Sequence, residues 1–511
     1  MGLYSLLHVD MGILTCCAVI LLMLYIYRKL KRTYSVFERL SIPGPKPIWV
    51  LGNIHEFKDE DKLSMFKIWR KRYGDVYGFY EGFKPSVVVC DPELSRSILV
   101  KHFDKFNIRP IYNPFLYYPD EYSLLNSHGP KWKAQRTAVV AAFNAIPVNI
   151  IIKRLCKVGD SLVDILSKAV AKKNGFDIVS IIDRFLLDAI SFAAFDYEVN
   201  SMQNEDAILF KFMKVFNESS AADNPIAGLA RVYESLTPFL QLFDTKHRDI
   251  HIQHIHELRE LIQTRIKKDC QTAPDNIIDF LLQTTIKDEN IENGERRHLT
   301  VEEIVAHLNS IIGGGFGTTN SALAFVIYQL VINPAVQDKV FEEIKHHCGS
   351  FDEPDISFIQ NLKYLDSVIS ETLRVLPCAP GVARQCTEDC TINGVQFKRG
   401  MVIRIMMCVL YGDDSCYPDP KQFRPERFTE QEKESRHPNL YLPFGQGPRI
   451  CPGYKLAVTL IKVAIVYILR HFVLEPCDQT KEPLPTALRP MLCPKEGVFL
   501  RLIVRNNNRL N

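Results

Sequence analysis

The run FGQGPRICPG, which begins at Phe444, contains the residues of this chain best arranged for chemistry. Its glycines, Gly445 and Gly447, allow a tight turn and a close approach to neighbouring backbone. The residues after Cys451 have a helical pattern, and Pro452 suits the first turn of that helix. A cysteine at a helix N-terminus lies in positive potential, which lowers the pKa of its thiol and favours the thiolate. The run therefore predicts a thiolate metal ligand, although most single cysteines are simply buried apolar residues.

An arginine, Arg449, stands two residues before Cys451. Its planar guanidinium can bind a carboxylate through two parallel hydrogen bonds. A thiolate held in a glycine-rich turn, beside an arginine that can pair a carboxylate, is what an axial haem ligand requires. The loop therefore predicts haem binding.

A second glycine-rich run lies within the longest helical pattern of the chain. This pattern starts at Thr300, which forms a capping box with Glu303, and it ends at Pro334. Four glycines lie within 313–317, and each costs about 1 kcal/mol relative to alanine inside a helix. We expect the backbone to open there or to approach another group closely. A phosphate-binding loop is a poor match, because the G-K-[ST] ending is absent and helix flanks both sides.

Two further pairs stand at helical spacing. The first is E-x-x-R, formed by Glu371 and Arg374, and the second is W-x-x-x-R, formed by Trp132 and Arg136. Taken alone, an i,i+3 ion pair is worth only about 0.3 kcal/mol and is usually a surface contact. Together with Arg427 between aromatic residues and the spacing F-G-x-G-x-R-x-C-x-G, these motifs resemble the cytochrome P450 superfamily. The resemblance runs from the proline-rich stretch after the N-terminus almost to the C-terminus.

The resemblance implies a haem-thiolate enzyme with haem b as its cofactor. Cys451 would be the axial ligand of the iron, in the loop that Phe444 begins. The residues expected to bind the haem propionates are Trp132, Arg136, Arg384 and Arg449. The residues expected to have a structural role behind the haem loop are Glu371, Arg374 and Arg427. Residues 371–400 look most like microsomal members that act on steroids and foreign compounds.

The distal helix of this family bends over the haem and carries the pattern A/G-G-x-acid-T, which falls here on residues 314–318. Thr318 would supply the hydroxyl that donates toward dioxygen. Gly317 occupies the position of the acid, so the usual carboxylate of the proton relay is missing. We therefore expect a monooxygenase that wastes part of its NADPH as hydrogen peroxide. Candidate walls of the substrate pocket are Phe316 and the segments 115–118 and 379–382.

A mostly helical fold must position these motifs. Helical periodicity recurs at 153–171, 205–216, 251–268 and 358–376, as well as in the long pattern that starts at residue 300. The 251–268 helix is charged, and we expect its polar side chains to face solvent. Residues 76–90 predict a hairpin, and short strands are expected near 391–392 and 402–403. We predict a mostly α protein with small β-sheets and the cytochrome P450 fold, preceded by one N-terminal transmembrane helix.

The N-terminus has the pattern of a membrane anchor. Residues 11–27 carry no charge and are followed by the basic run RKLKR. As a helix these residues span about 25 Å, and apolar residues upstream extend the span. The basic run should stay in the cytosol, and no convincing cleavage site supports a signal peptide. We expect a membrane anchor over 1–32, a proline-rich hinge over 33–50 and the haem-thiolate monooxygenase domain over 51–511.

The composition agrees with a globular protein of a reducing compartment. Hydrophobic residues make up 47% of the chain and charged residues 24%, with a net charge of +3 that gives no indication of nucleic-acid binding. The fourteen cysteines show no C-x-x-C pair, so they are expected to be free thiols. We therefore expect a single-pass protein of the endoplasmic reticulum membrane, with its catalytic domain in the cytosol and no nucleic acid as partner.

The function expected from the resemblance is insertion of one oxygen atom of O2 into a lipophilic small molecule, such as a steroid, a fatty acid or a xenobiotic. Electrons would come from NADPH through NADPH–cytochrome reductase, with cytochrome b5 as a second candidate donor, because no nucleotide-binding motif occurs in the chain. Two alternatives stay open. One is a haem-thiolate isomerase or dehydratase that acts on a peroxide without external electrons, which Gly317 favours. The other is a haem-binding sensor or carrier.

Overall fold

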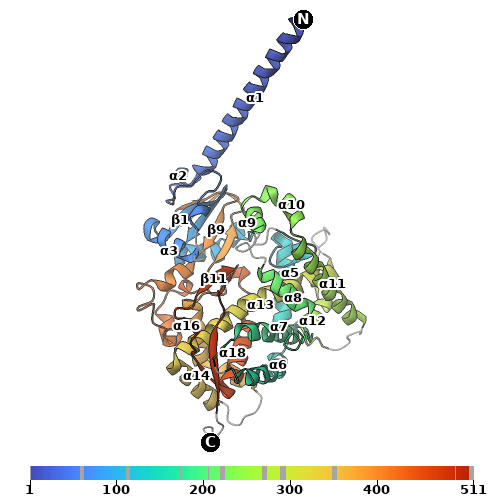
Figure 1. The fold of residues 1–511 in the computed structure, drawn as a ribbon, viewed down its shortest axis with the longest axis vertical. Helices are drawn as coiled ribbons and strands as arrows, with labels where there is room; N and C mark the ends of the chain where they lie inside the picture. Colours follow the sequence, from blue (N-terminus) through green and yellow to red (C-terminus); the bar gives the residue numbers. More distant parts are fainter. Residues whose placement is uncertain are drawn as a thin grey trace.

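The computed structural model describes residues 2–57, 62–110, 115–172, 174–204, 206–218, 225–267, 273–287, 295–347, 354–489 and 491–505. Helices dominate, and one of them, α1 (Gly2–Tyr34), projects from the rest of the molecule as a single rod (Figure 1). The larger helices of the body are α3 (Lys62–Tyr73), α5 (Gly129–Ala145), α6 (Val148–Ala169), α7 (Val179–Phe195), α8 (Ile208–Glu218), α11 (Thr245–Lys267), α13 (Val301–Ile332), α14 (Pro334–His347), α16 (Lys363–Val375) and α18 (Tyr454–His471). Shorter ones are α2 (Val36–Arg39), α4 (Pro92–Arg96), α9 (Pro225–Val232), α10 (Thr237–Leu240), α12 (Ile277–Gln283), α15 (Ile356–Asn361) and α17 (Glu430–Glu434).

Among the residues that the structure describes, two helices are long and apolar enough to cross a membrane. The first is Gly12–Tyr34 within α1, with a mean hydropathy of 1.9 and none of its apolar window buried. The second is α13, but 78% of its apolar window is buried inside the protein, so it belongs to the core. Helices α5 and α6 meet the criteria of length and composition only when they are taken together, and they are bent by 71°. The predicted apolar N-terminal helix is therefore confirmed as a candidate membrane span.

In the described part of the chain, five small sheets accompany the helices. The largest has the order β1-β2-β9-β6, built from Val76–Glu81, Lys84–Val89, Val402–Ile405 and Val382–Gln385. A three-stranded sheet has the order β10-β13-β3, built from Phe472–Glu475, Phe499–Val504 and Phe176–Asp177. The remaining pairs are β4-β5 (Thr285–Lys287, Arg296–His298), β7-β8 (Cys390–Ile392, Val395–Phe397) and β11-β12 (Thr486–Arg489, Met491–Pro494). The predicted hairpin at 76–90 is the antiparallel pair β1-β2, which turns at Gly82 with a φ of 59°.

The buried apolar residues form two main clusters. The larger one surrounds α13, whose neighbours are α7, α11, α16 and α18, while the second covers the sheet β1-β2-β9-β6. Nearly every residue of the second half of α13, from Ser321 to Val331, is buried. The all-round apolar pattern of α13 thus reflects burial in a helical core rather than a membrane span. This helix fixes the position of the central glycine run.

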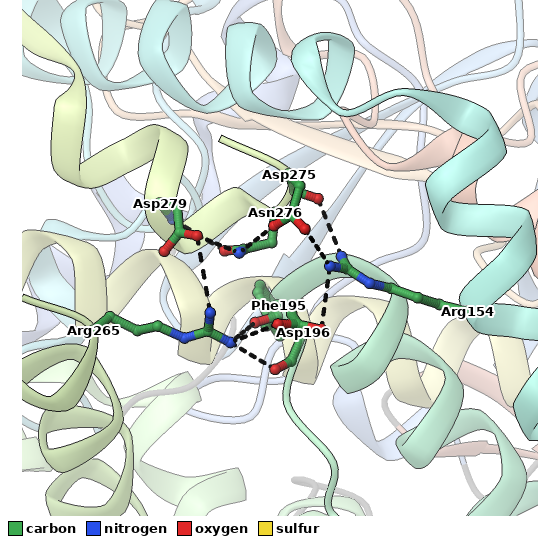
Figure 2. Close-up of polar contacts among 7 residues, drawn as sticks. All are labelled: Arg154, Phe195, Asp196, Arg265, Asp275, Asn276 and Asp279. Carbon is green, nitrogen blue, oxygen red and sulfur yellow. Dashed lines mark hydrogen bonds and ion pairs between the residues drawn. The ribbon is translucent and has the colours of Figure 1, made fainter. Parts of the chain in front are cut away.

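A charged network ties four helices together on one side of this core, as Figure 2 shows. Arg154 of α6 donates to the carboxylate of Asp275 at 2.9 Å and lies 3.2 Å from the carboxylate of Asp196, which follows α7. Arg265 of α11 donates to the backbone oxygen of Asp196 at 2.7 Å and to its carboxylate at 3.1 Å. It also lies 3.9 Å from a carboxylate oxygen of Asp279 in α12. Each guanidinium therefore faces two carboxylates.

The structure corrects two helix predictions. Residues 358–376 form two helices, α15 and α16, because the chain breaks at Leu362, whose ψ of 72° is not helical. The prediction that the polar side chains of 251–268 face solvent holds for Gln253, His256, Glu260, Gln263, Thr264 and Lys267, which are exposed. It is wrong for His251 and His254, which are buried together with His247 of the same helix. They are covered because α11 packs against α8 and α13. Burial lowers the pKa of His251 to about 4 and that of His254 to about 3, so both are neutral at physiological pH.

Candidate functional site

The cysteine loop has the tight geometry that its glycines predict. The amide of Cys451 donates to the carbonyl of Phe444 at 3.0 Å and closes the loop. Gly445 and Gly447 have φ values of 74° and 76°, which favour glycine, and a Cβ on Gly447 would overlap the carbonyl oxygen of Leu99. The sequence predicts Pro452 in the first turn of the following helix, but α18 begins two residues after it, at Tyr454, with Gly453 as its N-cap. The loop thus holds Cys451 just ahead of the helix.

The predicted low pKa of the Cys451 thiol is wrong for the protein without a metal. Burial raises this pKa above its ordinary value, and the amide of Gly453 with the charges of Arg136 and Arg109 only partly opposes that effect. The helix terminus is therefore too weak to overcome desolvation. A metal cation would deprotonate the thiol outright, so the loop is suited to a cysteine that becomes a thiolate on coordination.

Arginines converge beside this cysteine. Arg449 is 3% exposed, donates to the carbonyls of Asn107 and Ser127 at 2.8 and 2.9 Å, and lies 4.2 Å above the ring of Trp132. Arg136 of α5 donates to the carbonyl of Ile450 at 2.6 Å. The loop residue and the W-x-x-x-R pair are therefore brought together as the sequence predicts.

We define the arginine cluster as Arg109, Arg136, Arg384 and Arg449. The positive charges of these side chains repel one another. Burial and the charges of the other three members lower the pKa of Arg449 to about 9. Arg136 likewise has a lowered pKa, because of burial and the charge of Arg109. Arg384, in β6, is 1% exposed and donates to the carbonyl of Ala383 at 2.8 Å. The cluster concentrates positive charge in a buried place.

The cluster fits the two carboxylates of haem b. Within the described residues, the hydrogen bonds of Arg136 and Arg449 all go to backbone carbonyls, and neither arginine pairs with a carboxylate. Buried charges are normally paired, so such a cluster is complete only with an anionic ligand. Arg109 was missed from the sequence, because its segment has no motif and only the fold brings it to the loop.

Helix α13 carries the second half of the candidate site. The predicted capping box is confirmed, with Glu303 and Thr300 bonded in both directions at 3.2 and 2.9 Å. The glycine run does not interrupt the helix, and the hydroxyl of Thr318 donates to the carbonyl of Gly314 at 2.7 Å. Gly314 is exposed although the helix around it is mostly buried, and a Cβ there would meet nothing within 4 Å. The helix therefore borders open space on the face of Gly314 and Thr318, which are one turn apart.

The predicted structural triad is present behind the loop. Glu371 accepts from Arg374 at 2.7 and 2.8 Å, and its carboxylate lies 3.3 Å from Arg427. Arg374 also donates to the carbonyl of Tyr411 at 2.7 Å, and all three charged side chains are at most 2% exposed. These residues form a buried ion cluster in which one carboxylate pairs with two arginines.

The candidate pocket walls give mixed results. Phe316 is 2% exposed and belongs to the helical core, so it is not a wall of open space. Phe115 is buried against Ala227 and Ala230, in a small cluster of its own. Tyr117 donates to the carboxylate of Asp244 at 3.0 Å, which links its segment to the start of α11. The sequence could not separate core from pocket here, because both are apolar.

Comparison with known proteins agrees with this geometry. The family model described as Cytochrome P450 matches residues 42–501. Among curated relatives, Cytochrome P450 3A28 of Bos taurus is 32% identical over 498 residues, covering 96% of this chain and 95% of that protein. Cytochrome P450 3A29 of Sus scrofa is 31% identical over 499 residues, covering 96% of each chain. The family uses haem b with a cysteine thiolate as axial ligand. The chain belongs to the cytochrome P450 family and is a monooxygenase of that family.

Proposed function

We propose that this monooxygenase is anchored in the endoplasmic reticulum membrane and oxidises lipophilic small molecules with electrons from NADPH–cytochrome reductase. Cys451 is the proposed axial ligand, and the arginine cluster with Trp132 binds the propionates. The observation that carries the assignment is that Arg136 and Arg449 pair with no carboxylate among the described residues, while the charges of Arg136 and Arg109 act on Cys451. A steroid or xenobiotic substrate is the preferred class, in line with the resemblance of residues 371–400.

The ligand assignment is tested by spectroscopy. The reduced, CO-bound wild type should show the strongly red-shifted Soret band of a thiolate haem, and Cys451→Ala should lose it. Cys378 offers a matched control, because it is a buried thiol close enough to Cys451 for the charge of Cys451 to raise its pKa. Cys378→Ala should keep the red-shifted band. A histidine-like spectrum in the wild type, or loss of the band only in Cys378→Ala, would refute the assignment.

The bound haem supplies the activation of dioxygen, and the chain supplies charge, orientation and protons. The arginine cluster would bind the carboxylates of the group and so orient it. The hydroxyl of Thr318 lies on the open face of α13 and can pass a proton from its oxygen toward that space. The apolar core around α13 excludes bulk water from the remainder of the helix.

Exposed lysines near the cysteine loop support a docking surface for the reductase. Lys133 and Lys455 are exposed, and Lys455 borders a hollow of about 130 Å³ beside Pro452. Lys131 is held 3.8 Å from the centre of the Tyr122 ring. Positive side chains on this face would steer an acidic partner, and salt would weaken the attraction.

Charge reversal tests this surface. Lys133→Glu with Lys455→Glu should slow reduction by the reductase and flatten its dependence on salt. Lys71→Glu on α3 is the control, because this exposed lysine lies on a helix packed against β1, at the anchor end of the molecule (Figure 1). An unchanged reduction rate in the double variant would contradict the docking proposal.

Exposed apolar residues support the proposed membrane location. The residues at positions 48–51 are about half exposed, as are Leu229, Phe239, Leu242 and Phe243. The two groups are joined, since Tyr233 donates to the carbonyl of Val50 at 3.1 Å. Figure 1 places α9 and α10 at the end of the body from which α1 departs. An apolar surface beside an anchor is suited to a bilayer and to entry of lipophilic substrates from it.

Protease treatment of sealed microsomes tests the topology. The catalytic domain should be digested, whereas full protection would place it in the lumen. Deletion of residues 1–32 should release much of the protein, with some retained by the apolar surface. A reductase-free assay with a hydroperoxide substrate tests the isomerase alternative, which Gly317 favours. Turnover without NADPH would support that alternative and count against dependence on a reductase.

A further inference from the structure

Two cysteine thiols outside the candidate haem site lie against each other. The sulfur atoms of Cys386 and Cys390 are 3.8 Å apart, which is a hydrogen-bonding distance for sulfur. Both cysteines are free thiols, and three residues separate them in the sequence. Cys386 directly follows β6, and Cys390 is the first residue of β7. The fold therefore brings together two thiols that can be joined by a single bond.

The backbone at both thiols is held in place. The amide of Cys386 donates to the carbonyl of Met401 at 2.9 Å, and the carbonyl of Cys386 accepts from the amide of Gly400 at 2.8 Å. Cys390 pairs with Phe397 in the antiparallel hairpin β7-β8. Because both backbone positions are fixed, the two sulfur atoms stay neighbours without a covalent link.

Closure of the pair requires only a small movement. The sulfur–sulfur bond of a disulfide is about 2.05 Å long, so the two atoms must approach each other by about 1.8 Å. The Cys386 side chain is buried, and its sulfur donates to the carbonyl of Glu388 at 2.9 Å. The Cys390 side chain is only half-buried, so it is the one with room to turn about χ1. Rotation of Cys390 toward a stationary Cys386 can therefore close the bond.

The surroundings give the two thiols different reactivity. Burial raises the pKa of Cys386 to about 12, and the neighbouring Cys390 adds to this rise. Burial also raises the pKa of Cys390, but the hydrogen bond with Cys386 and the charge of Lys105 oppose the rise. Lys105 is kept nearby by its ion pair with Glu388 at 2.9 Å. Since the thiolate is the reactive form, Cys390 is the thiol that reacts first, and the raised pKa makes that reaction slow.

The expected chemistry of this enzyme supplies an oxidant. Gly317 stands in the position of the usual acid, and we therefore expect hydrogen peroxide to be released during turnover. Peroxide converts an accessible cysteine to a sulfenic acid, which condenses with a neighbouring thiol to a disulfide. In a reducing compartment such disulfides are transient and act in catalysis or in redox sensing. A pair of adjacent thiols in a protein that leaks peroxide fits the second of these roles.

We propose that Cys386 and Cys390 form a reversible disulfide when the protein meets hydrogen peroxide. The Cys390 thiolate attacks one peroxide oxygen, the O–O bond breaks, and the hydroxide that leaves takes up the thiol proton as water. The Cys386 sulfur then attacks the Cys390 sulfenic acid, so that an S–S bond forms and a second water leaves with the Cys386 proton. Two electrons pass from the thiols to the peroxide. A small thiol such as glutathione reduces the bond again by exchange.

Peptide mapping tests this site, because trypsin releases both cysteines together. It cuts after Arg384 and after Lys398, and residues 385–398 contain no other cysteine. In holoenzyme treated with hydrogen peroxide and then alkylated, this peptide should carry no alkyl group and be lighter than its reduced form by the mass of two hydrogen atoms. Dithiothreitol added before alkylation should restore two alkylated cysteines.

Single variants test the order of the two steps. Cys386→Ser should leave Cys390 as a sulfenic acid that dimedone traps, because the second thiol is gone. Cys390→Ser should leave Cys386 unoxidised, because Cys386 is buried. Cys416→Ser is the matched control, since Cys416 is a half-buried thiol whose sulfur contacts the hydroxyl of Ser415. The control should form the disulfide like the wild type, and the variants should keep the reduced CO spectrum.

Turnover separates the site from the source of its oxidant, which rests on the proposed function. With NADPH and reductase but no added peroxide, the linked peptide should appear, and catalase should prevent it. If added peroxide forms the disulfide and turnover does not, the site stands and the expected release of peroxide is wrong. The proposal is overturned if the 385–398 peptide keeps two free thiols up to the peroxide concentration at which the haem spectrum begins to bleach. Oxidation of only one of the two cysteines in the wild type would overturn it as well.

Discussion

The protein buries arginines in two opposite ways. In the network of Figure 2, Arg154 and Arg265 share the carboxylates of Asp196, Asp275 and Asp279, so every cation has an anion within 4 Å. In the arginine cluster beside Cys451, burial and the charges of the other three arginines lower the pKa of Arg449 to about 9. The first arrangement is complete without a ligand, whereas the second requires one.

This difference distinguishes structural from ligand-binding arginines without reference to the family. A network in which every arginine has carboxylate partners contributes to the stability of the fold itself, and removal of an arginine leaves carboxylates unpaired. An unbalanced cluster costs stability until an anion binds, so its benefit appears only in the complex. We therefore expect an arginine substitution in the network to lower the free energy of unfolding with or without haem. A substitution in the arginine cluster should instead weaken haem binding.

The largest effect on stability is expected for Arg154→Met. The change removes a guanidinium whose side chain is only 9% exposed, which leaves Asp275 without an arginine and Asp196 with Arg265 alone. Because the two carboxylates are 47% and 35% exposed, we expect a cost of about 1.5–3 kcal/mol, as for a hydrogen bond to a charged group. The free energy of unfolding, measured by denaturant titration, should fall by this amount with or without haem. An equal loss only in the haem-bound form would contradict the distinction.

A smaller effect with a different signature is expected for Arg136→Met. This arginine makes one hydrogen bond, to the carbonyl of Ile450, and its pKa is lowered by burial and by Arg109. The haem-free protein should unfold within about 1 kcal/mol of wild type, because repulsion is relieved as a hydrogen bond is lost. Haem retention, measured by transfer to apomyoglobin, should weaken about tenfold, as expected for loss of one charged contact worth about 1.4 kcal/mol.

The fold and the loop could be predicted because their signals are local. Capping at Thr300, the hairpin at 76–90 and the spacing around Cys451 each depend on residues close in sequence. Arg109 could not be found in this way, since only the folded chain brings it near Arg449. The hydrogen bond between Asp183 and Asn320 likewise depends on how α7 packs against α13. Contacts and charge interactions between residues far apart in the sequence could therefore not be predicted from it.

The error over α11 has the same cause. Its histidines have the pattern of a polar surface, and only the packing of α8 and α13 shows that they are buried. Arginines stay charged on burial and need partners, whereas a buried histidine can lose its charge. The histidines of α11 are thus a third way of placing a basic side chain in the core.

Acid should destabilise the protein through these buried histidines. The pKa of His254 is lowered to about 3 by burial and by His251, so the folded protein excludes a proton that the unfolded chain binds below about pH 6.5. Stability should therefore fall as pH drops from 6.5 toward 4, by up to about 1.4 kcal/mol per pH unit for this histidine. His254→Phe should reduce the slope, as measured by urea unfolding at several pH values. Asp120, whose pKa is raised to about 6, opposes the trend.

The smallest effect is expected for an ion pair of the same chemistry at the surface. Arg259 of α11 donates twice to Glu302 of α13 at 2.8 Å, yet the side chains are 30% and 25% exposed. Water already solvates both groups, so removal of the arginine leaves no buried charge. Arg259→Met should cost less than about 1 kcal/mol, and the difference should shrink as salt is added. The effect of Arg154→Met should be less sensitive to salt, because the Arg154 side chain is only 9% exposed. If both variants lost the same stability and responded equally to salt, burial would not be what distinguishes these arginines.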